Sequence, residues 1–369
     1  MRDCRYIALL VIASVLVGCG GKPTDPAAVD MEARKLIDRM LETPAKWSGR
    51  DRADYFRMAE ESQPALTQLG PAALPAMIDG LGKGEGKIGQ WLLLPIAKNG
   101  ESAVMPLATA LRDPDFHRRR WALLAISLVA NEGTDVSKAG PAILDCTRDA
   151  DVAIRAASMM AISSAKPDRG VHELIAALND PEASVRGEAA KILGMVSAVR
   201  APGAIVEEIS LPPPTPTVLS EALPPLIAAL QDEAPAVRRE VAGALGEFGP
   251  AAEPALRQAM EDSDGEVRAA ALVSLCCVRA DGAVEELIDA LDDPSQRVRF
   301  AGAKWLGLLA NPDDLILRRL RPPPLPQIDR SAFAAAVPPL TTALDDKDAG
   351  VRSAATKALA IIRPEPMTK

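Results

Sequence analysis

Four segments of this chain share one template: LIAALNDPEASVRGEAAKILGMV (174–196), LIAALQDEAPAVRREVAGALGEF (226–248), LIDALDDPSQRVRFAGAKWLGLL (287–309) and LTTALDDKDAGVRSAATKALAII (340–362). In each, apolar side chains recur every three or four residues on both sides of a short polar turn, which is typical of two amphipathic helices. Because neither helix can bury its apolar face alone, such pairs become stable when they stack on one another. The pattern predicts an all-α solenoid, an array of antiparallel helical hairpins.

Each of these units contains an Asp that is followed six residues later by an Arg. Weaker copies in residues 107–129, 142–164 and 255–276 contain the same pair. The Asp falls where the first helix ends, so its carboxylate can accept backbone N–H groups that open the second helix. The seven pairs are Asp113/Arg119, Asp149/Arg155, Asp180/Arg186, Asp232/Arg238, Asp262/Arg268, Asp293/Arg299 and Asp346/Arg352.

The period can be extended backwards to a degenerate eighth unit in residues 73–100. There Lys83 occupies the Asp position and Gly89 the Arg position. A terminal repeat tolerates this loss because it has no preceding neighbour in the stack. Residues 30–72 contain two amphipathic segments, about 31–41 and 52–69, which we expect to be capping helices over the open end. Residues 364–369 form a short C-terminal tail.

The shared pattern L-I-x-A-L-x-D-x-x-x-x-V-R-x-x-A-x-x-A-L-G resembles HEAT repeats, in particular the short variety also found in phycobilisome bilin lyases. The resemblance covers residues 73–363 and implies a HEAT/armadillo-like superhelix of about eight hairpins. It also implies that the Arg of one unit reaches the Asp of its neighbour, which makes a structural Asp/Arg ladder. The alternative is an anion-binding stripe of arginines, which is less favoured because every Arg comes with a carboxylate.

Two units are followed by extra residues. Spacings between successive ladder Asp residues are 36, 31, 52, 30, 31 and 53, so two Pro-rich inserts are placed at 198–222 and 311–336. Their sequences are related: AIVEEISLPPPTP (204–216) aligns with LILRRLRPPPLP (315–326). Pro triplets stiffen surface loops in the polyproline-II conformation, and loops that recur in a solenoid often mark a binding face.

The two inserts carry opposite charge at aligned positions, because Glu207 and Glu208 align with Arg318 and Arg319. These four residues are candidate partner-binding positions. They could also contact one another, although three units of stacking separate the two inserts. Stiff, solvated loops without a binding role are the alternative.

The N-terminus has the pattern of an export signal. Arg2 and Arg5 precede an apolar run over residues 6–17, which is long enough for a signal-peptide core and short for a membrane-spanning helix. The run ends in Leu16-Val17-Gly18-Cys19, which resembles the lipobox of bacterial lipoproteins. An ordinary secretory peptide or a short buried helix are the alternatives.

The lipobox resemblance implies that residues 1–18 are a lipoprotein signal peptide and that Cys19 is the lipidated first residue of the mature protein. Residues 19–29 would then be a flexible tether. In that family, Asp directly after the Cys retains a protein at the inner membrane, whereas Gly20 stands here. The resemblance therefore favours a lipid anchor in the outer membrane, facing the periplasm.

The chain shows few signs of catalytic chemistry. It has two His, neither at metal-binding spacing, and neither a phosphate-binding Gly loop nor a nucleophile elbow. Of the five Cys, Cys146, Cys276 and Cys277 are expected to be buried free thiols. The net charge of −8 argues against nucleic-acid binding. We predict no cofactor, no metal site and no catalytic residue.

The favoured function is a non-catalytic scaffold of the cell envelope that binds a protein or peptide along its concave surface or its Pro-rich inserts. It would contact the membrane through the lipid on Cys19. One alternative is an enzyme or enzyme subunit of the bilin-lyase type, which the resemblance alone suggests. The other is a periplasmic carrier or regulator. The sequence leaves the partner and the oligomeric state open.

Overall fold

The structure, a computed structural model, describes residues 25–41, 49–86, 88–165, 170–197, 216–278, 283–311 and 330–362. Within these ranges the chain forms helices joined by turns and contains no strand. The predicted signal peptide 1–18 and Cys19 lie outside the described residues. Four candidate insert residues also lie outside them: Glu207, Glu208, Arg318 and Arg319.

Consecutive helices pair into hairpins, each with a first and a second helix. In the described ranges the pairs are α1 (Pro26–Leu41) with α2 (Gly49–Leu69), α3 (Leu74–Gly80) with α4 (Gly89–Ala97), α5 (Glu101–Ala110) with α6 (Phe116–Asn131), α7 (Gly140–Cys146) with α8 (Val152–Ala165), α9 (Val171–Ala177) with α10 (Ala183–Ser197), α11 (Pro216–Ala229) with α12 (Pro235–Leu245), α13 (Glu253–Ala259) with α14 (Gly265–Val278), α15 (Ala283–Asp289) with α16 (Gln296–Ala310), and α18 (Arg330–Thr342) with α19 (Ala349–Ile362). Short 3-10 helices accompany several of them: η1 (Gly70–Ala73), η2 (Lys83–Gly86), η3 (Ser137–Ala139), η4 (Gly249–Ala252), η5 (Ala290–Asp292) and η6 (Ala343–Asp345).

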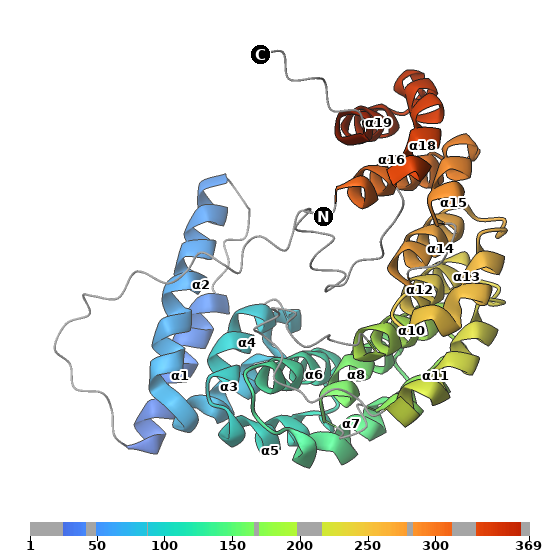
Figure 1. Ribbon diagram of the computed structural model, residues 1–369. Helices are drawn as coiled ribbons and strands as arrows, with labels where there is room; N and C mark the ends of the chain where they lie inside the picture. The colour runs from blue at the N-terminus through green and yellow to red at the C-terminus, as the bar shows by residue number, and fades with distance from the viewer. Residues whose placement is uncertain are drawn as a thin grey trace.

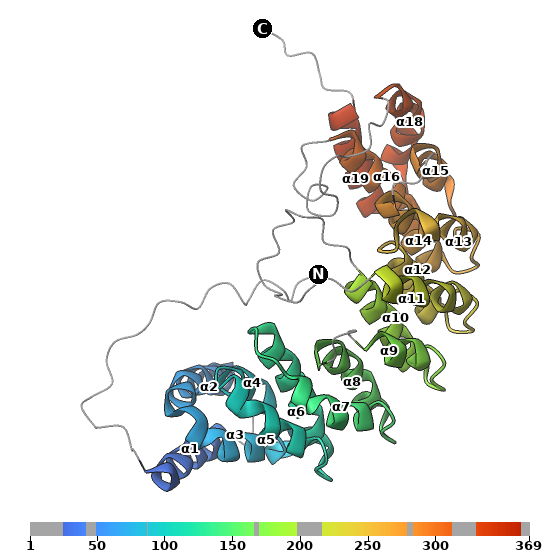
Figure 2. The ribbon, with the colours of Figure 1, turned by 60° about the horizontal axis from the view of Figure 1, so that its bottom comes forward.

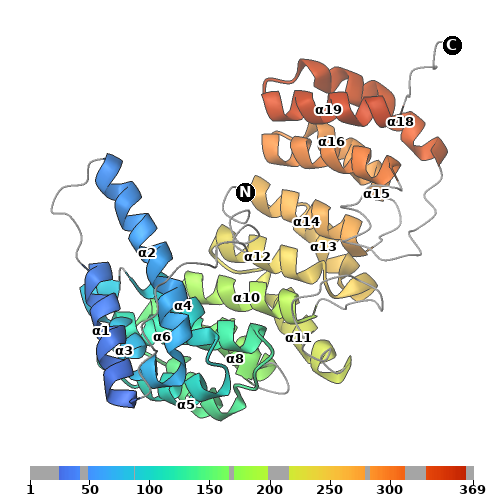
Figure 3. The same ribbon diagram turned by 90° about the vertical axis from the view of Figure 1, so that its left-hand side faces the viewer.

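The hairpins stack in chain order into a curved solenoid (Figure 1). The second helices lie on the inner side of the curve and the first helices on the outer side. Second helices pack more extensively on one another than first helices do, so the stack curves toward them. Views from two other directions show the same order, with α1 and α2 at one end and α18 and α19 at the other (Figures 2 and 3). The fold is an all-α solenoid, as predicted.

Small side chains let the second helices approach closely at two joints. A Cβ added to Gly194 of α10 would lie 2.8 Å from the Cα of Ala244 in α12. A Cβ on Gly307 of α16 would lie 3.1 Å from the Cα of Ala358 in α19. In the sequence, a long insertion separates the two helices of each of these joints. Close helix packing therefore continues across both insertions.

Several predicted boundaries differ from the observed ones. Helix α1 begins at Pro26, so it includes the last four residues of the tether predicted for 19–29. The reason is local: Asp25 Oδ1 accepts the N–H of Ala27 at 3.3 Å, and Val29 is buried against the rest of the stack. Together, α1 and α2 form a complete hairpin that packs on α3 and α4.

The Pro-rich inserts are shorter than predicted at their C-terminal ends. Helix α11 starts at Pro216 and α18 starts at Arg330, so the last residues assigned to the inserts 198–222 and 311–336 are helical. Ala222 and Ala336 are fully buried on these helices. Because one face of each helix is buried, both helices begin earlier in the chain than the repeat template does.

Candidate functional site

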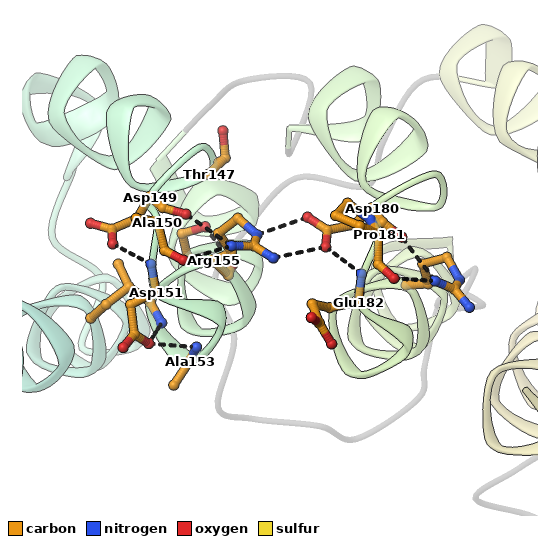
Figure 4. A network of polar contacts seen from close by, with 12 residues as sticks. Thr147, Asp149, Ala150, Asp151, Ala153, Arg155, Asp180, Pro181 and Glu182 are labelled. Atoms are coloured by element: carbon orange, nitrogen blue, oxygen red, sulfur yellow. Dashed lines mark hydrogen bonds and ion pairs between the residues drawn. The ribbon is translucent and has the colours of Figure 1, made fainter.

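The turn inside each hairpin is ordered by the ladder Asp. In the turn between α7 and α8, Asp149 Oδ1 accepts the N–H of Asp151 at 2.8 Å (Figure 4). Asp180 accepts the N–H of Glu182 at 2.9 Å in the next hairpin. The same bond forms at the other ladder positions, Asp113, Asp232, Asp262, Asp293 and Asp346. A carboxylate thus satisfies a backbone donor that the sharp turn leaves without a helical partner.

The cap of the second helix is a different residue from the one predicted. We expected the ladder Asp to receive the first N–H groups of the second helix, but in five of the seven hairpins the residue two positions later does so. Asp115 Oδ1 accepts the N–H of Arg118 at 2.7 Å, and Asp348 Oδ1 accepts that of Val351 at 3.0 Å. Equivalent caps are Asp151, Asp264 and Ser295. The recurrence of Asp or Ser two positions after the ladder Asp is the sequence signal for this role.

The ladder Arg contacts its own turn and the neighbouring hairpin at once. Arg155 Nη1 donates to the backbone oxygens of Asp149 at 3.0 Å and Ala150 at 3.2 Å. Its Nε and Nη2 donate to the two carboxylate oxygens of Asp180, at 2.9 and 3.0 Å (Figure 4). This is a bidentate, charge-assisted pair, the strongest geometry available to these side chains.

Six of these pairs join successive hairpins, as the HEAT resemblance implied. We call each one a rung. Their shortest distances are 3.2 Å for Arg119–Asp149, 2.9 Å for Arg155–Asp180, 2.5 Å for Arg186–Asp232, 2.7 Å for Arg238–Asp262, 2.7 Å for Arg268–Asp293 and 2.6 Å for Arg299–Asp346. Rungs Arg186–Asp232 and Arg299–Asp346 cross the joints that carry the inserts. The rungs are therefore structural contacts that fix the register of one hairpin on the next.

The two ends of the ladder differ from its interior. Arg352 donates only to backbone oxygens of its own turn in the described part of the chain, those of Asp346 and Lys347. At the other end, Asp113 pairs with Arg118 of its own hairpin at 2.6 Å. The preceding hairpin has Gly89 where a ladder Arg would stand, so no rung can form there.

The rungs lower the pKa of their carboxyl groups. The hydrogen bond from Arg186 holds the pKa of Asp232 below its ordinary value of 3.8, against burial, which raises it. The pKa values of Asp262 and Asp346 are lowered in the same way. At Asp180 and Asp293 burial is the larger single effect and raises the pKa, but hydrogen bonds and charge from the ladder Arg and the turn outweigh it. All five groups are ionised at neutral pH.

The second helices leave one stripe of side chains uncovered on the inner side of the solenoid. Their other faces pack on the first helices and on neighbouring second helices, so the remaining face points into the concave side (Figure 1). This inner stripe consists of the residues one, five and nine positions after each ladder Arg, with Gly89 counted as the first: Gln90, Leu94, Lys98; Arg120, Leu124, Leu128; Ala156, Met160, Ser164; Gly187, Lys191, Met195; Arg239, Gly243, Glu247; Ala269, Val273, Cys277; Phe300, Lys304, Leu308; Ser353, Lys357, Ile361. All except Gly187 are exposed or half-buried.

Large apolar side chains are exposed in this inner stripe. The exposed fractions are 41% for Leu94, 51% for Met195, 37% for Phe300 and 39% for Ile361. Other large apolar residues of the stripe are half-buried: Leu124, Leu128, Met160, Val273 and Leu308. Apolar side chains that recur along one continuous face mark an interaction surface more than isolated ones do.

The remaining reactive side chains are placed as follows. Cys146 and Cys276 are buried, Cys277 is half-buried, and none of these three is part of a disulfide. Burial raises the pKa of the Cys146 thiol to about 11, so this Cys is a poor nucleophile. Within the described ranges, no three His, Cys, Asp or Glu side chains are grouped to hold a metal ion. Among the helices described, none is long and apolar enough to cross a bilayer.

Comparison with known proteins supports the repeat assignment. The profile of the HEAT repeats family matches residues 216–275 and 253–317. Among curated proteins no match was found. Residues 216–317 contain HEAT repeats, in agreement with the resemblance seen in the sequence.

Three solved structures resemble this chain at low sequence identity. One is an engineered protein, 16% identical over 92% of this chain and 96% of that chain, with a TM-score of 0.41. Another is the complex of CpcE and CpcF of phycocyanin lyase from Nostoc sp. PCC7120, 17% identical over 69% of this chain and 93% of that chain, with a TM-score of 0.39. A third is importin beta, 13% identical over 91% of this chain and 42% of that chain, with a TM-score of 0.49.

Proposed function

We propose that this protein is a non-catalytic scaffold that binds a protein partner along its inner face, and that a lipid on Cys19 holds it at a membrane of the bacterial cell envelope. The inner stripe is the observation that carries the proposal. It presents exposed Leu94, Met195, Phe300 and Ile361 on one side of a single curved surface. A partner that follows the curve would contact many hairpins at once.

The rungs support this role because they hold the binding surface in shape. Each rung joins two hairpins at their turns and uses side chains that lie outside the inner stripe. The side chain of Arg186 is only 10% exposed, and that of its partner Asp232 only 9%. A surface that is already ordered loses less conformational entropy when a partner binds.

Sequence alone supports the membrane anchor. The lipobox-like stretch that ends at Cys19 motivates it, and Gly20 favours the outer membrane over the inner. The test compares the full chain with the variant Cys19→Ser in cell fractions. We expect the wild-type chain in the membrane fraction, with slower processing when lipoprotein signal peptidase is inhibited. A wild-type chain that is soluble and insensitive to the inhibitor would contradict the anchor.

Site-specific photo-crosslinking tests the binding face. A photo-crosslinking amino acid would replace Phe300 on the inner side or, as the control, Met105 on the outer helix α5, which is 54% exposed. Irradiation of intact cells should give discrete protein adducts from position 300 and fewer from position 105. Equal adduct patterns from both positions would refute a binding role for the inner face.

A further inference from the structure

The inner stripe has the opposite charge to the protein as a whole. The chain carries a net charge of −8. The stripe contains one acidic residue, Glu247, and six basic ones: Lys98, Arg120, Lys191, Arg239, Lys304 and Lys357. Acidic side chains lie elsewhere, in the turns inside the hairpins and on the first helices, for example Glu285, Glu286 and Asp289 on α15.

Half of these basic groups are neutralised by carboxylates close by. Lys98 pairs with Glu132 at 2.7 Å. Lys191 pairs with Glu188 at 3.2 Å, and Arg239 pairs with Glu240 at 2.6 Å. The other three basic residues, Arg120, Lys304 and Lys357, have no ion pair to any residue in the described part of the chain. Their charge is therefore available to a partner.

Two of these cations lie beside the apolar residues of the last joint. On α16, Phe300, Lys304 and Leu308 follow one another at intervals of four residues, which places them on one helix face. On α19, Lys357 and Ile361 do the same. Because Gly307 and Ala358 bring α16 and α19 into close contact, these five residues form one surface, which we call the C-terminal patch.

We propose that the C-terminal patch binds an acidic segment of a partner protein whose carboxylates face Lys304 and Lys357 and whose apolar side chains cover Phe300 and Ile361. This inference rests on the proposed scaffold function and names the chemistry of its partner. Charge complementarity supports it, because the acidic protein as a whole repels an acidic ligand whereas Lys304 and Lys357 attract one to this patch. The exposed apolar side chains provide apolar surface that a partner can bury when it binds.

Two other anionic ligands fit the patch less well. A lipid bilayer presents a flat, extended surface, whereas the patch lies on the inner side of a curved solenoid, on its last two second helices α16 and α19 (Figure 1). Nucleic acid would bring many phosphates close to the acidic remainder of the protein. An acidic peptide is narrow enough to enter the concave side and can present carboxylates and apolar side chains next to one another.

Binding of defined peptides to the detergent-purified full chain tests the proposal. Three fluorescent peptides of equal length would be compared by anisotropy: Glu alternating with Leu, Lys alternating with Leu, and Glu alternating with Ser. We expect the Glu/Leu peptide to bind at least about tenfold more tightly than the other two. The variant Lys304→Glu/Lys357→Glu should weaken its binding by about tenfold, and added salt should reduce the difference.

Lys347→Glu is the matched control, because Lys347 is exposed in the turn of the same last hairpin and lies outside the patch. It should leave binding unchanged. Equal binding of the Glu/Leu and Lys/Leu peptides, or an equal loss in both variants, would overturn the proposal. So would tighter binding of phosphatidylglycerol vesicles than of the Glu/Leu peptide.

One outcome would assign the patch to this chain itself. Residues 204–211, AIVEEISL, combine apolar and acidic side chains. Stronger peptide binding in the variant Glu207→Lys/Glu208→Lys would mean that this segment competes for the patch, and the proposal of a separate partner would be wrong. Crosslinked adducts at position 300 without any Glu/Leu binding would refute the acidic partner and leave the scaffold function standing.

Discussion

The joint between α10 and α12 and the joint between α4 and α6 bring together equivalent helices, yet different contacts hold them. At the first, the bidentate Arg186–Asp232 pair spans the two turns, and Gly194 lets the helix backbones approach. At the second there is no rung, and the ring of Trp121 packs directly over Gly89. The second joint has an exposed ion pair, Lys98–Glu132, at the far ends of its helices. The comparison therefore separates what a nearly buried rung contributes to a joint from what packing contributes.

At the turns of the α4–α6 joint, the polar contact also runs in the opposite direction. In every rung, an Arg reaches forward to the Asp of the following hairpin. Here Arg118 reaches back, and its Nη2 donates to the backbone oxygen of Asp79 at 3.3 Å. Its Nη1 binds Asp113 in its own turn. The loss of the ladder Arg at Gly89 thus leaves room for an indole ring and moves the polar contact to a neighbouring residue.

Removal of a rung carboxylate should have the largest effect. Asp232→Ala leaves the nearly buried guanidinium of Arg186 without its bidentate partner, so we expect a loss of about 2 to 3 kcal/mol in unfolding free energy. Asp113→Ala should cost about 1 kcal/mol, because Arg118 keeps its bond to Asp79. Denaturant unfolding measures both values, and hydrogen exchange in α10 and α12 locates the change.

A double variant separates the charge from the packing at this rung. Arg186→Met/Asp232→Leu removes both partners and leaves no buried charge alone, so it should be more stable than Asp232→Ala. A double variant no more stable than Asp232→Ala would mean that the rung contributes through its turn-ordering bonds and not through charge pairing.

Two glycines of the same helix should respond in opposite ways. Gly194→Ala places a Cβ 2.8 Å from the Cα of Ala244, so the two helix backbones must move apart. We expect a loss of about 1.5 kcal/mol in unfolding free energy. Gly187→Ala meets only Glu240 Cγ at 3.7 Å and should be neutral or stabilising by about 0.5 kcal/mol. Thermal unfolding of both variants checks this. Equal effects would show that helix propensity, and not the close approach, governs these positions.

The rungs could be predicted because the resemblance to HEAT repeats implies that the Arg of one unit reaches the Asp of its neighbour. The seven Asp/Arg pairs at one internal spacing identify the residues to which this applies. The helix caps were missed because the ladder Asp and the Asp or Ser two positions later are equally plausible caps on composition. Only the observed bonds, such as the one from Arg118 to Asp115, decide between them.

The basic inner stripe could not be read from the whole-chain composition. Its charges are single residues on different helices, such as Arg120 and Lys357, and the total of −8 hides them. The fold is needed to know which face of each second helix points inward. The insert boundaries were misplaced for a related reason, since burial of Ala222 depends on neighbours that the repeat template does not include.

A substitution at the other joint should have a smaller effect than Gly194→Ala. In Gly89→Ala the new Cβ meets the side-chain ring of Trp121, which is half-buried and can turn aside. In Gly194→Ala the new Cβ meets the Cα of Ala244, a backbone atom that cannot rotate away. We expect a loss of about 1 kcal/mol. Tryptophan fluorescence should shift if the ring becomes more exposed. A loss as large as that of Gly194→Ala, without a spectral change, would mean that the ring cannot move.

Acid should loosen the two kinds of joint to different extents. The pKa of Asp232, like those of Asp180, Asp262, Asp293 and Asp346, is lower in the folded protein than its ordinary value of 3.8. The folded state therefore gains stability from each ionised carboxylate above about pH 5 and loses it as pH falls below about 4, through the folded pKa. The packing of Trp121 on Gly89 involves no proton. Hydrogen exchange would be measured from pH 6 to pH 3 and corrected for the intrinsic rate. The amides of α10 and α12 should lose protection first, while those of α4 and α6 stay protected to lower pH. The reverse order would mean that packing, and not the rungs, sets the strength of the interior joints.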